Sequence, residues 1–446
     1  MAGNRRWWAL AVLAAAQFMV IMDTSIIGVA LPEMQRDLGF SAGGLQWVFN
    51  AYVVAFGGLL LLGGRLSDLF GARRVFVTGW VVLIAGSVVA AAAGTAWVEI
   101  AGRAVQGVGG ALIAPAAMTL LMMLFGQNPR ELGKAMALYG AAAPAGGTAG
   151  VFLGGVITEY LSWPWVFIIY LPIGLATLAA TGLLPAVGGR RGGVDLVGAV
   201  SVTAGIALVV YAIVAANWLA GLGGALLLVL FLIVQRTARQ PLMPLAIWRT
   251  PGLATANLAM GLLGAAWIPM WYFLNLYLQQ VLGYGAFPSG AALLPMTVAI
   301  MIFMVGVTAK LLGRFGAKPL IVLGLAVLAA GVAGLQFTGG FATNVLPASL
   351  VAAVGMSLAY IPAMMSAMSG ARPEEAGLAS GIVNTTYQVG SAIGLAVMTA
   401  VATSRDQLTD GFQAAFLGAA VVAVAGAALT AALMRKPAVR EPVSPS

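Results

Sequence analysis

Charged residues are scarce in this 446-residue sequence, and cysteine and histidine are absent. Charged residues make up only 8% of the chain. Without cysteine the chain has no disulfide, no cysteine nucleophile and no zinc-finger site. Without histidine it has no histidine proton relay, so any proton chemistry must rest on a carboxylate. A polar stretch long enough for a soluble domain is also missing.

Motifs that the sequence lacks exclude two further classes of function. A Gly-x(4)-Gly-Lys-Ser/Thr stretch is absent, so ATP is not expected to be the direct fuel of any process. The clustered acids or nucleophile elbow of a membrane-embedded enzyme do not occur either. We therefore expect no enzyme activity, no cofactor and no metal site.

Long apolar runs dominate what is present. The chain is 61% hydrophobic with a mean hydropathy of +1.00. Runs long enough to cross a bilayer, about 20 residues, recur throughout. The pattern predicts an all-α polytopic membrane protein, since helices satisfy their own backbone groups in lipid. The expected fourteen spans are 8–31, 44–64, 75–94, 96–125, 134–158, 164–184, 195–214, 218–235, 252–281, 288–312, 319–338, 345–369, 377–403 and 411–434.

The basic residues agree with fourteen spans. With the amino terminus in the cytoplasm, all but three of the 22 basic residues fall on the cytoplasmic side. Arg36 and Arg405 fall outside, and Arg103 lies within the membrane. Both termini are then cytoplasmic. The bias also explains the net charge of +9 without nucleic acid, because the bases are spread over short loops.

An internal repeat predicts two related halves. Segment 64–74, GRLSDLFGARR, resembles segment 309–319, AKLLGRFGAKP, and both join a cytoplasm-bound helix to the next outward one. The alternative is a chance likeness between turns rich in Gly and Arg. The repeat predicts a six-helix bundle over 1–190, two inserted helices with a linker over 191–245, and a six-helix bundle with a short cytoplasmic tail over 246–446.

Asp23 and Arg103 are the charged residues deepest in apolar runs. A carboxylate at a helix centre costs roughly 2.5–3.5 kcal/mol on insertion scales, so it is kept for a function. Each residue lies eight positions from the outer end of its span, about 12 Å at 1.5 Å per residue. Two alternatives remain open: Asp23 as a static structural acid, and Arg103 paired with Glu99 one helical turn away.

Four segments resemble the major facilitator superfamily, and specifically its fourteen-helix drug:proton antiporter branch, the EmrB/QacA type. They are the loop motif at 64–74, the first-helix motif MDTSIIGVALP at 22–32, the fourth-helix motif RAVQGVGG at 103–110 and GLASGIVNT at 377–385. The fifth-helix antiporter motif departs from this pattern, because Val151 stands where proline is expected. Pro144 could supply the kink instead.

The resemblance implies a role for the charged residues. The family fold brings helices 1 and 4 together, so Asp23 and Arg103 can face each other as the proton-coupling pair. The loop-motif residues Gly64, Asp68, Gly71, Arg73 and Arg74 are expected to latch a cytoplasmic gate. The alternative is that the arginines only set topology.

Polar and aromatic residues within the spans are candidates for a substrate cavity, where aromatic faces suit lipophilic and cationic ligands. Packing or interfacial positions are the alternative for each of them. These candidates are Gln17, Asn50, Tyr52, Gln106, Trp267, Trp271, Tyr272, Asn275, Tyr360, Asn384, Tyr387 and Gln388.

The glycine-rich fifth helix, Gly140 to Gly155, has small residues about four apart. This spacing permits a close helix contact, which we expect to be a sliding seam, with ordinary packing as the alternative.

Taken together, the sequence predicts a monomeric, proton-coupled exporter in a bacterial cytoplasmic membrane. Multidrug or natural-product efflux by alternating access is expected, with a small lipophilic or monocationic substrate. The last expectation follows because Asp23 is the only acid placed deep in a span. A proton-coupled importer and a dedicated metabolite exporter are the alternatives. A channel or receptor would need no two-fold repeat.

Overall fold

The structure is a computed structural model that describes residues 3–186, 188–189, 193–336, 340–369 and 376–434. Within that part, the regular elements are all helical, as the long apolar runs predict. The first half comprises α1 (Gly3–Leu38), α2 (Trp47–Phe70), α3 (Ala72–Ala91), α4 (Ala96–Phe125), α5 (Pro129–Tyr160), α6 (Trp165–Ile168), α7 (Tyr170–Ala179) and the 3-10 turn η1 (Ala180–Leu183).

The remaining helices follow from residue 196 onward. They are α8 (Leu196–Val214), α9 (Trp218–Thr237), η2 (Leu245–Arg249), α10 (Leu253–Leu276), η3 (Tyr277–Val281), α11 (Ala286–Ile302), η4 (Phe303–Val307), α12 (Thr308–Phe315), α13 (Ala317–Gly334), η5 (Phe341–Val345), α14 (Leu346–Ser369), α15 (Ala376–Thr403) and α16 (Leu408–Leu433). The short elements η3, η4 and η5 are single π-helical turns that continue into their neighbours.

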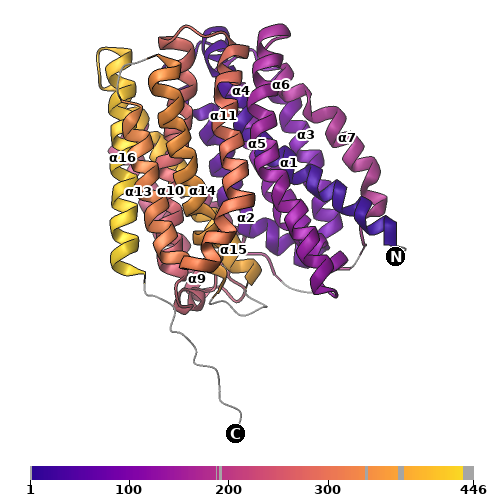
Figure 1. The fold of residues 1–446 in the computed structure, drawn as a ribbon. Coiled ribbons are helices and arrows are strands. Elements are labelled where there is room, and N and C mark those ends of the chain that lie inside the picture. The colour runs from indigo at the N-terminus through magenta and orange to yellow at the C-terminus, as the bar shows by residue number, and fades with distance from the viewer. Residues whose placement is uncertain (1–2, 187, 190–192, 337–339, 370–375, 435–446) are drawn as a thin grey trace.

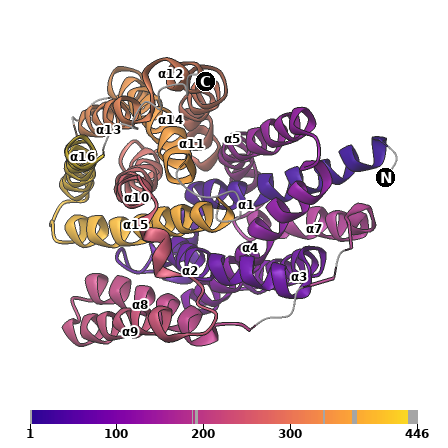
Figure 2. The same cartoon turned by 90° about the horizontal axis from the view of Figure 1, so that it is seen from below.

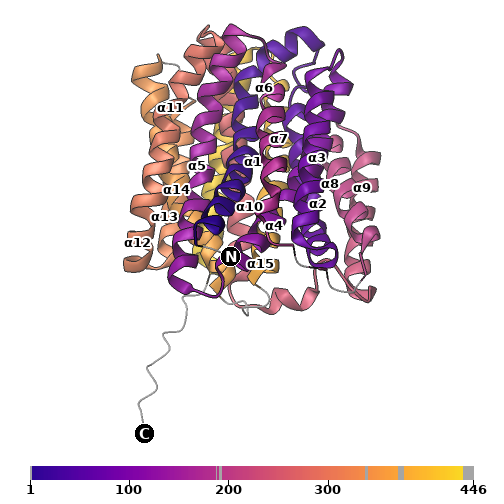
Figure 3. The ribbon, with the colours of Figure 1, turned by 90° about the vertical axis from the view of Figure 1, so that its right-hand side faces the viewer.

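The helices are gathered into two bundles that stand side by side (Figure 1). Helices α1 to α7 form one bundle and α10 to α16 the other, as the views from the side and from below show (Figures 2 and 3). The bundles meet where α2 packs on α15 and where α5 packs on α11. The α8–α9 pair packs against α2 and α15 at one edge of the molecule.

Fewer helices meet the requirements for a membrane span than the sequence predicts. Of the residues described, twelve helices are long and apolar enough to cross a bilayer, against the fourteen expected. The two others are α11 and α15. Helix α11 has only 17 residues before its path is interrupted by the π turn η4. Helix α15 has 28 residues, but glycine, serine, threonine, asparagine and glutamine dilute its apolar character.

The repeated segments have the same local structure. In both, a helix stops at a glycine with positive φ and another helix starts at once: Gly71 has φ 90° and Gly316 has φ 79°. Only glycine adopts this conformation without a steric cost, so both positions require it. Within the motif 64–74, α2 stays helical to Phe70 and α3 begins at Ala72, so only Gly71 lies outside a helix.

One predicted bundle boundary falls inside a helical turn, and the other lies outside the described residues. The boundary between 190 and 191 lies outside the described residues, as does the tail from 435 to 446. The boundary between 245 and 246 falls within η2, just before α10.

Helices α1 and α5 touch along their backbones. A Cβ atom on Gly146 would lie 2.3 Å from the carbonyl oxygen of Phe18, and one on Gly150 would lie 2.8 Å from that of Met22. Gly154 repeats the contact one turn further along. The four-residue spacing therefore produces the close helix contact expected for this segment. Whether the seam slides stays a prediction.

We predict that Gly146→Ala destabilises the protein by about 1–3 kcal/mol, because the new methyl group meets a backbone carbonyl that cannot rotate away. The control is Gly140→Ala in the same helix, where a Cβ meets nothing within 4 Å. That change should be neutral or stabilising, since alanine favours helices. Thermal unfolding of the purified protein in detergent measures both, and equal melting temperatures would contradict the backbone contact.

Candidate proton-coupling site

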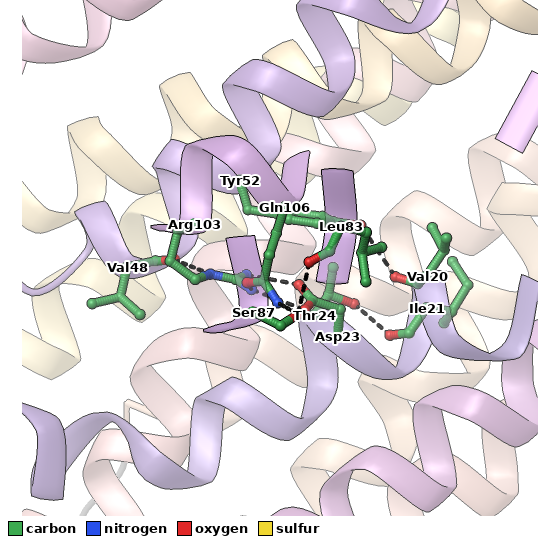
Figure 4. A network of polar contacts seen from close by, with 10 residues as sticks. All are labelled: Val20, Ile21, Asp23, Thr24, Val48, Tyr52, Leu83, Ser87, Arg103 and Gln106. Atoms are coloured by element: carbon green, nitrogen blue, oxygen red, sulfur yellow. Dashed lines mark hydrogen bonds and ion pairs between the residues drawn. The ribbon is translucent and has the colours of Figure 1, made fainter. Parts of the chain in front are cut away.

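The Asp23 and Arg103 side chains form a buried ion pair between α1 and α4 (Figure 4). The Nη2–Oδ2 distance is 2.8 Å and the Nη1–Oδ1 distance is 2.9 Å, a two-point contact. Asp23 is 1% exposed and Arg103 is 0% exposed. The expectation that these two residues face each other matches the geometry. Their role in proton coupling is not tested by it.

Two further hydrogen bonds hold the guanidinium, from its Nε and Nη1 atoms. Its Nε donates to the Val48 carbonyl oxygen at 2.8 Å, and Nη1 also donates to Gln106 Oε1 at 2.7 Å. Gln106 Nε2 donates to Ser87 Oγ at 2.7 Å. The guanidinium thus joins α1, α2 and α4, and Gln106 extends the network to α3 (Figure 4).

Aromatic rings close the site from other directions. The guanidinium carbon of Arg103 lies 4.7 Å from the Tyr52 ring centroid and 5.9 Å from that of Phe167. Tyr52 itself donates to the Val20 carbonyl oxygen at 3.5 Å. Such an enclosure strengthens the electrostatic attraction and makes loss of either partner costly.

Glu99 does not pair with Arg103 in the described structure. The sequence left this pairing open as an alternative, but the ion pair of Arg103 is with Asp23. The sequence also places Glu99 towards the outer boundary, whereas the structure buries it completely, at 0% exposure. Glu99 is buried because α4 enters the bundle against α3 from its first turn.

The amino-terminal substrate candidates are largely engaged within their own bundle. Gln17 Oε1 accepts a hydrogen bond from Tyr139 at 3.0 Å, and Asn50 donates to Gln46 Oε1 at 3.1 Å. Tyr52 and Gln106 belong to the ion-pair network. These contacts favour positioning of the charged pair over direct substrate contact for Tyr52 and Gln106.

Several carboxy-terminal candidates gather where the two bundles meet. Trp271 packs so closely on α1 that a Cβ on Gly28 would lie 2.2 Å from its ring. Asn275 donates to the Trp271 carbonyl oxygen at 2.8 Å, and its own Oδ1 is buried without a hydrogen-bond partner in the described structure. Trp267 and Tyr272 are buried on the same helix.

The other candidates lie on α14 and α15. Tyr360 and Tyr387 meet with perpendicular rings, 5.5 Å between centroids. Asn384 donates to its own helix at Ser380 O, 3.0 Å away. Gln388 lies against Gly57 of α2. A Cβ atom added to Gly57 would lie 2.6 Å from the Cβ atom of Gln388.

A polar cavity that the sequence did not reveal lies between the bundles, at the end where α1 and α5 finish. Its volume is about 490 Å³. Hydrogen bonds across the bundle boundary surround it: Gln279 to Val29 O at 2.8 Å, Gln280 to Gln35 Oε1 at 3.0 Å, and Phe287 N to Glu159 Oε2 at 3.2 Å. It is lined by Pro32, Glu33, Gln35, Arg36, Thr158, Glu159, Gln279, Gln280, Tyr284, Gly285 and Ala286. The only sequence signal was polar residues at the ends of several spans.

The loop motif lies where α2 ends and α3 begins. Asp68 and Arg74 are exposed, and the described residues give Asp68 no ion pair with Arg73 or Arg74. Arg65 instead donates to Gly193 O at 3.3 Å and to Gln240 Oε1, which ties α2 to the segments flanking α8 and α9. Gly64 sits in an open helical position rather than at a close backbone contact. The latch role stays a prediction.

The fold consists of two helical bundles that meet along two seams, and the amino-terminal bundle holds a buried ion pair. This arrangement is that of a membrane transporter. The Major Facilitator Superfamily profile matches residues 13–395, and the chain belongs to that family. Membership makes the chain a multi-pass membrane transporter rather than an enzyme.

Similar proteins cover almost the whole chain. The cephamycin export protein CmcT of Amycolatopsis lactamdurans is 38% identical over 95% of this chain and 92% of its own length. The puromycin resistance protein Pur8 of Streptomyces alboniger is 38% identical over 90% of this chain and 82% of its own. The solved structure of the nucleoside transporter NupG matches the fold with a TM-score of 0.70, covering 97% of this chain and 100% of NupG at 15% identity.

We predict that Arg103→Gln costs about 3–5 kcal/mol of stability, because it leaves the Asp23 carboxylate buried without its counter-ion. Asp23→Asn should cost less, since Arg103 keeps its hydrogen bonds to Val48 and Gln106. The double substitution should recover much of the loss. Unfolding of the four proteins in detergent gives the coupling energy, and additive effects would argue against a direct pair.

Proposed function

We propose that the protein exports an antibiotic or related natural product in exchange for protons. The similarity to an antibiotic exporter and an antibiotic resistance protein over nearly the full chain supports the substrate class. The buried Asp23–Arg103 pair is the observation that carries the coupling. No cofactor is invoked, and the proton gradient is the energy source.

In this proposal Asp23 binds the proton that drives transport. An ionised Asp23 holds α1 to α4 through Arg103, whereas a protonated Asp23 is neutral and loses most of this attraction. The change in attraction biases the two bundles between outward- and inward-facing arrangements. Because Arg103 keeps Val48 and Gln106 as acceptors, it remains in place when the pair is weakened.

The substrate is proposed to bind between the bundles, beside Trp271 and Asn275. These side chains reach from α10 to α1 at Gly28, five residues after Asp23. Indole rings and one unpaired amide oxygen suit a small lipophilic or monocationic compound.

A dedicated exporter of one metabolite is the second candidate, and import is the third. These alternatives arise because the fifth-helix motif has Val151 where proline is expected. The structure shows that α5 still packs closely on α11 without the expected proline, because a Cβ on Gly290 would lie 2.6 Å from the Val151 carbonyl oxygen. The seam between the bundles therefore does not depend on proline at position 151, and export remains the favoured direction.

The proposed topology has fourteen spans, as in the EmrB/QacA-type branch, with α11–α12 and α15 crossing in addition to the twelve apolar helices. Both termini then lie in the cytoplasm of a bacterial cell and the protein acts as a monomer. Asp68, Arg73 and Arg74 lie at the cytoplasmic end, where they would form the gate latch when that end closes.

We expect single cysteines replacing Arg239 and Arg314 to be protected in intact cells, and one replacing Arg405 to be labelled. All three positions are exposed, and the chain has no native cysteine, so the labelling is direct. Position 314 decides whether α11–α12 crosses the membrane. Labelling at 314 by an impermeant maleimide would contradict the fourteen-span topology.

Expression in a drug-sensitive bacterium should raise resistance to at least one compound of an antibiotic panel that includes puromycin and a cephamycin. Asp23→Asn should abolish that resistance while the protein still reaches the membrane, because the mutant cannot bind the driving proton. The matched control is Asp410→Asn, an exposed acid at a helix start, which should behave as wild type. Full resistance with Asp23→Asn would remove Asp23 from the mechanism.

A further inference from the structure

Glu99 is a buried acid that the mechanism above does not use. It sits in the first turn of α4, and neither of its carboxylate oxygens has a hydrogen-bond partner among the described residues. Each of the two other buried acids of the described structure accepts at least one hydrogen bond. Asp23 holds Arg103, and Asp195 accepts from Gly198 N and Gln235 Nε2.

The surroundings of Glu99 make an uncompensated negative charge costly. An ionised carboxylate out of water needs donors or a counter-ion, and otherwise it is neutralised by a proton. Its own helix start supplies no bond to its side chain, since none is found in the described structure. The charged groups that act on it are Arg103 of the same helix and Asp23 of α1.

Among the described residues, Arg103 is the only cation that acts on Glu99, and its ion pair is with Asp23. Glu99 precedes it by four residues, which is one turn, or about 6 Å along the axis on the same helix face. The guanidinium Nε donates to Val48 O and Nη1 to Asp23 and Gln106, while Nη2 lies 2.8 Å from Asp23 Oδ2 and makes no hydrogen bond in the described structure. One guanidinium therefore stands between two buried carboxyl groups, and it pairs with only one of them in this structure.

We propose that Glu99 is a second proton-binding residue, and that it shares Arg103 with Asp23. In one state Asp23 is the ionised partner and Glu99 carries a proton. In the other, Asp23 has gained one proton, Glu99 has lost one, and Arg103 is the counter-ion of Glu99. Arg103 stays protonated throughout, and the three groups together hold one carboxyl proton and no net charge in both states. This inference rests on the proposed function, because the exchange supplies the proton that Asp23 needs.

A purely structural Glu99, which only fills space at the start of α4, predicts a different outcome. Such a residue would keep its proton whatever happens at Asp23. The two possibilities therefore separate in a measurement of the Glu99 proton that needs no substrate.

The test is infrared difference spectroscopy of the purified, lipid-reconstituted protein over a pH series, with protons as the only ligand. The carbonyl stretch of a protonated carboxyl group should be present at neutral pH in the wild type and lost in Glu99→Gln. Asp410→Asn, which removes the exposed first-turn acid of α16, should keep it. A band that survives Glu99→Gln would overturn the proposal.

The Asp23→Asn protein is the decisive arm, and it does not depend on Glu99→Gln folding. With Asp23 uncharged, Arg103 is free to pair with Glu99, so the band should titrate about one to three pH units lower than in the wild type. An unchanged titration would mean that Glu99 and Asp23 do not share Arg103, and the proposal fails.

The outcome is independent of whether the protein is a proton-driven exporter. A shifted band without any proton-driven efflux would leave the shared-guanidinium site standing and reject the coupling. If efflux depends on Asp23 but the band is unshifted, the coupling stands and the shared-guanidinium site is rejected.

Discussion

The ion pair between Asp23 and Arg103 is the constraint on which the amino-terminal bundle is built. The guanidinium of Arg103 has no exposure, and its Nε and Nη1 atoms donate to acceptors on α1, α2 and its own helix. Helices α1, α2 and α4 are thereby held in fixed positions around the positive charge of Arg103. The same enclosure means that any event that changes the charge at Asp23 alters the forces on three helices at once.

Close backbone contacts at glycine residues also hold the helices together. Glycine at four-residue intervals lets α5 lie against the carbonyl groups of α1, and a glycine on α11 lets that helix approach α5 on its other side. Small residues therefore let α5 pack closely on α1 of its own bundle and on α11 of the other bundle. Contacts of this kind depend on the small size of glycine, which lets the backbones approach closely.

The elements that the sequence could predict are those with a strong local signal. Asp23 and Arg103 were recognised because each is an isolated charge, at matching depth, in an apolar run. Their contact is confirmed by the distances, while their chemical role is untested. The spacing of Gly146, Gly150 and Gly154 likewise predicted a close helix contact.

Features that depend on tertiary packing were missed. Burial of Glu99 depends on where α4 meets α3, which its position near the end of a run does not reveal. The polar cavity is formed from both bundles, and Arg65 contacts residues more than a hundred positions away. The span count differs because α11 is interrupted by η4 after 17 residues and because polar residues dilute the apolar character of α15.

The placement of the α8–α9 pair makes the two flanks of the molecule unequal. One of the two seams between the bundles, α2 with α15, has α8 packed against both of its helices. The other, α5 with α11, has no such additional pair across it among the described helices (Figure 2). The two flanks of the molecule are therefore unequal: within the described residues, an additional helix pair covers one seam and none covers the other.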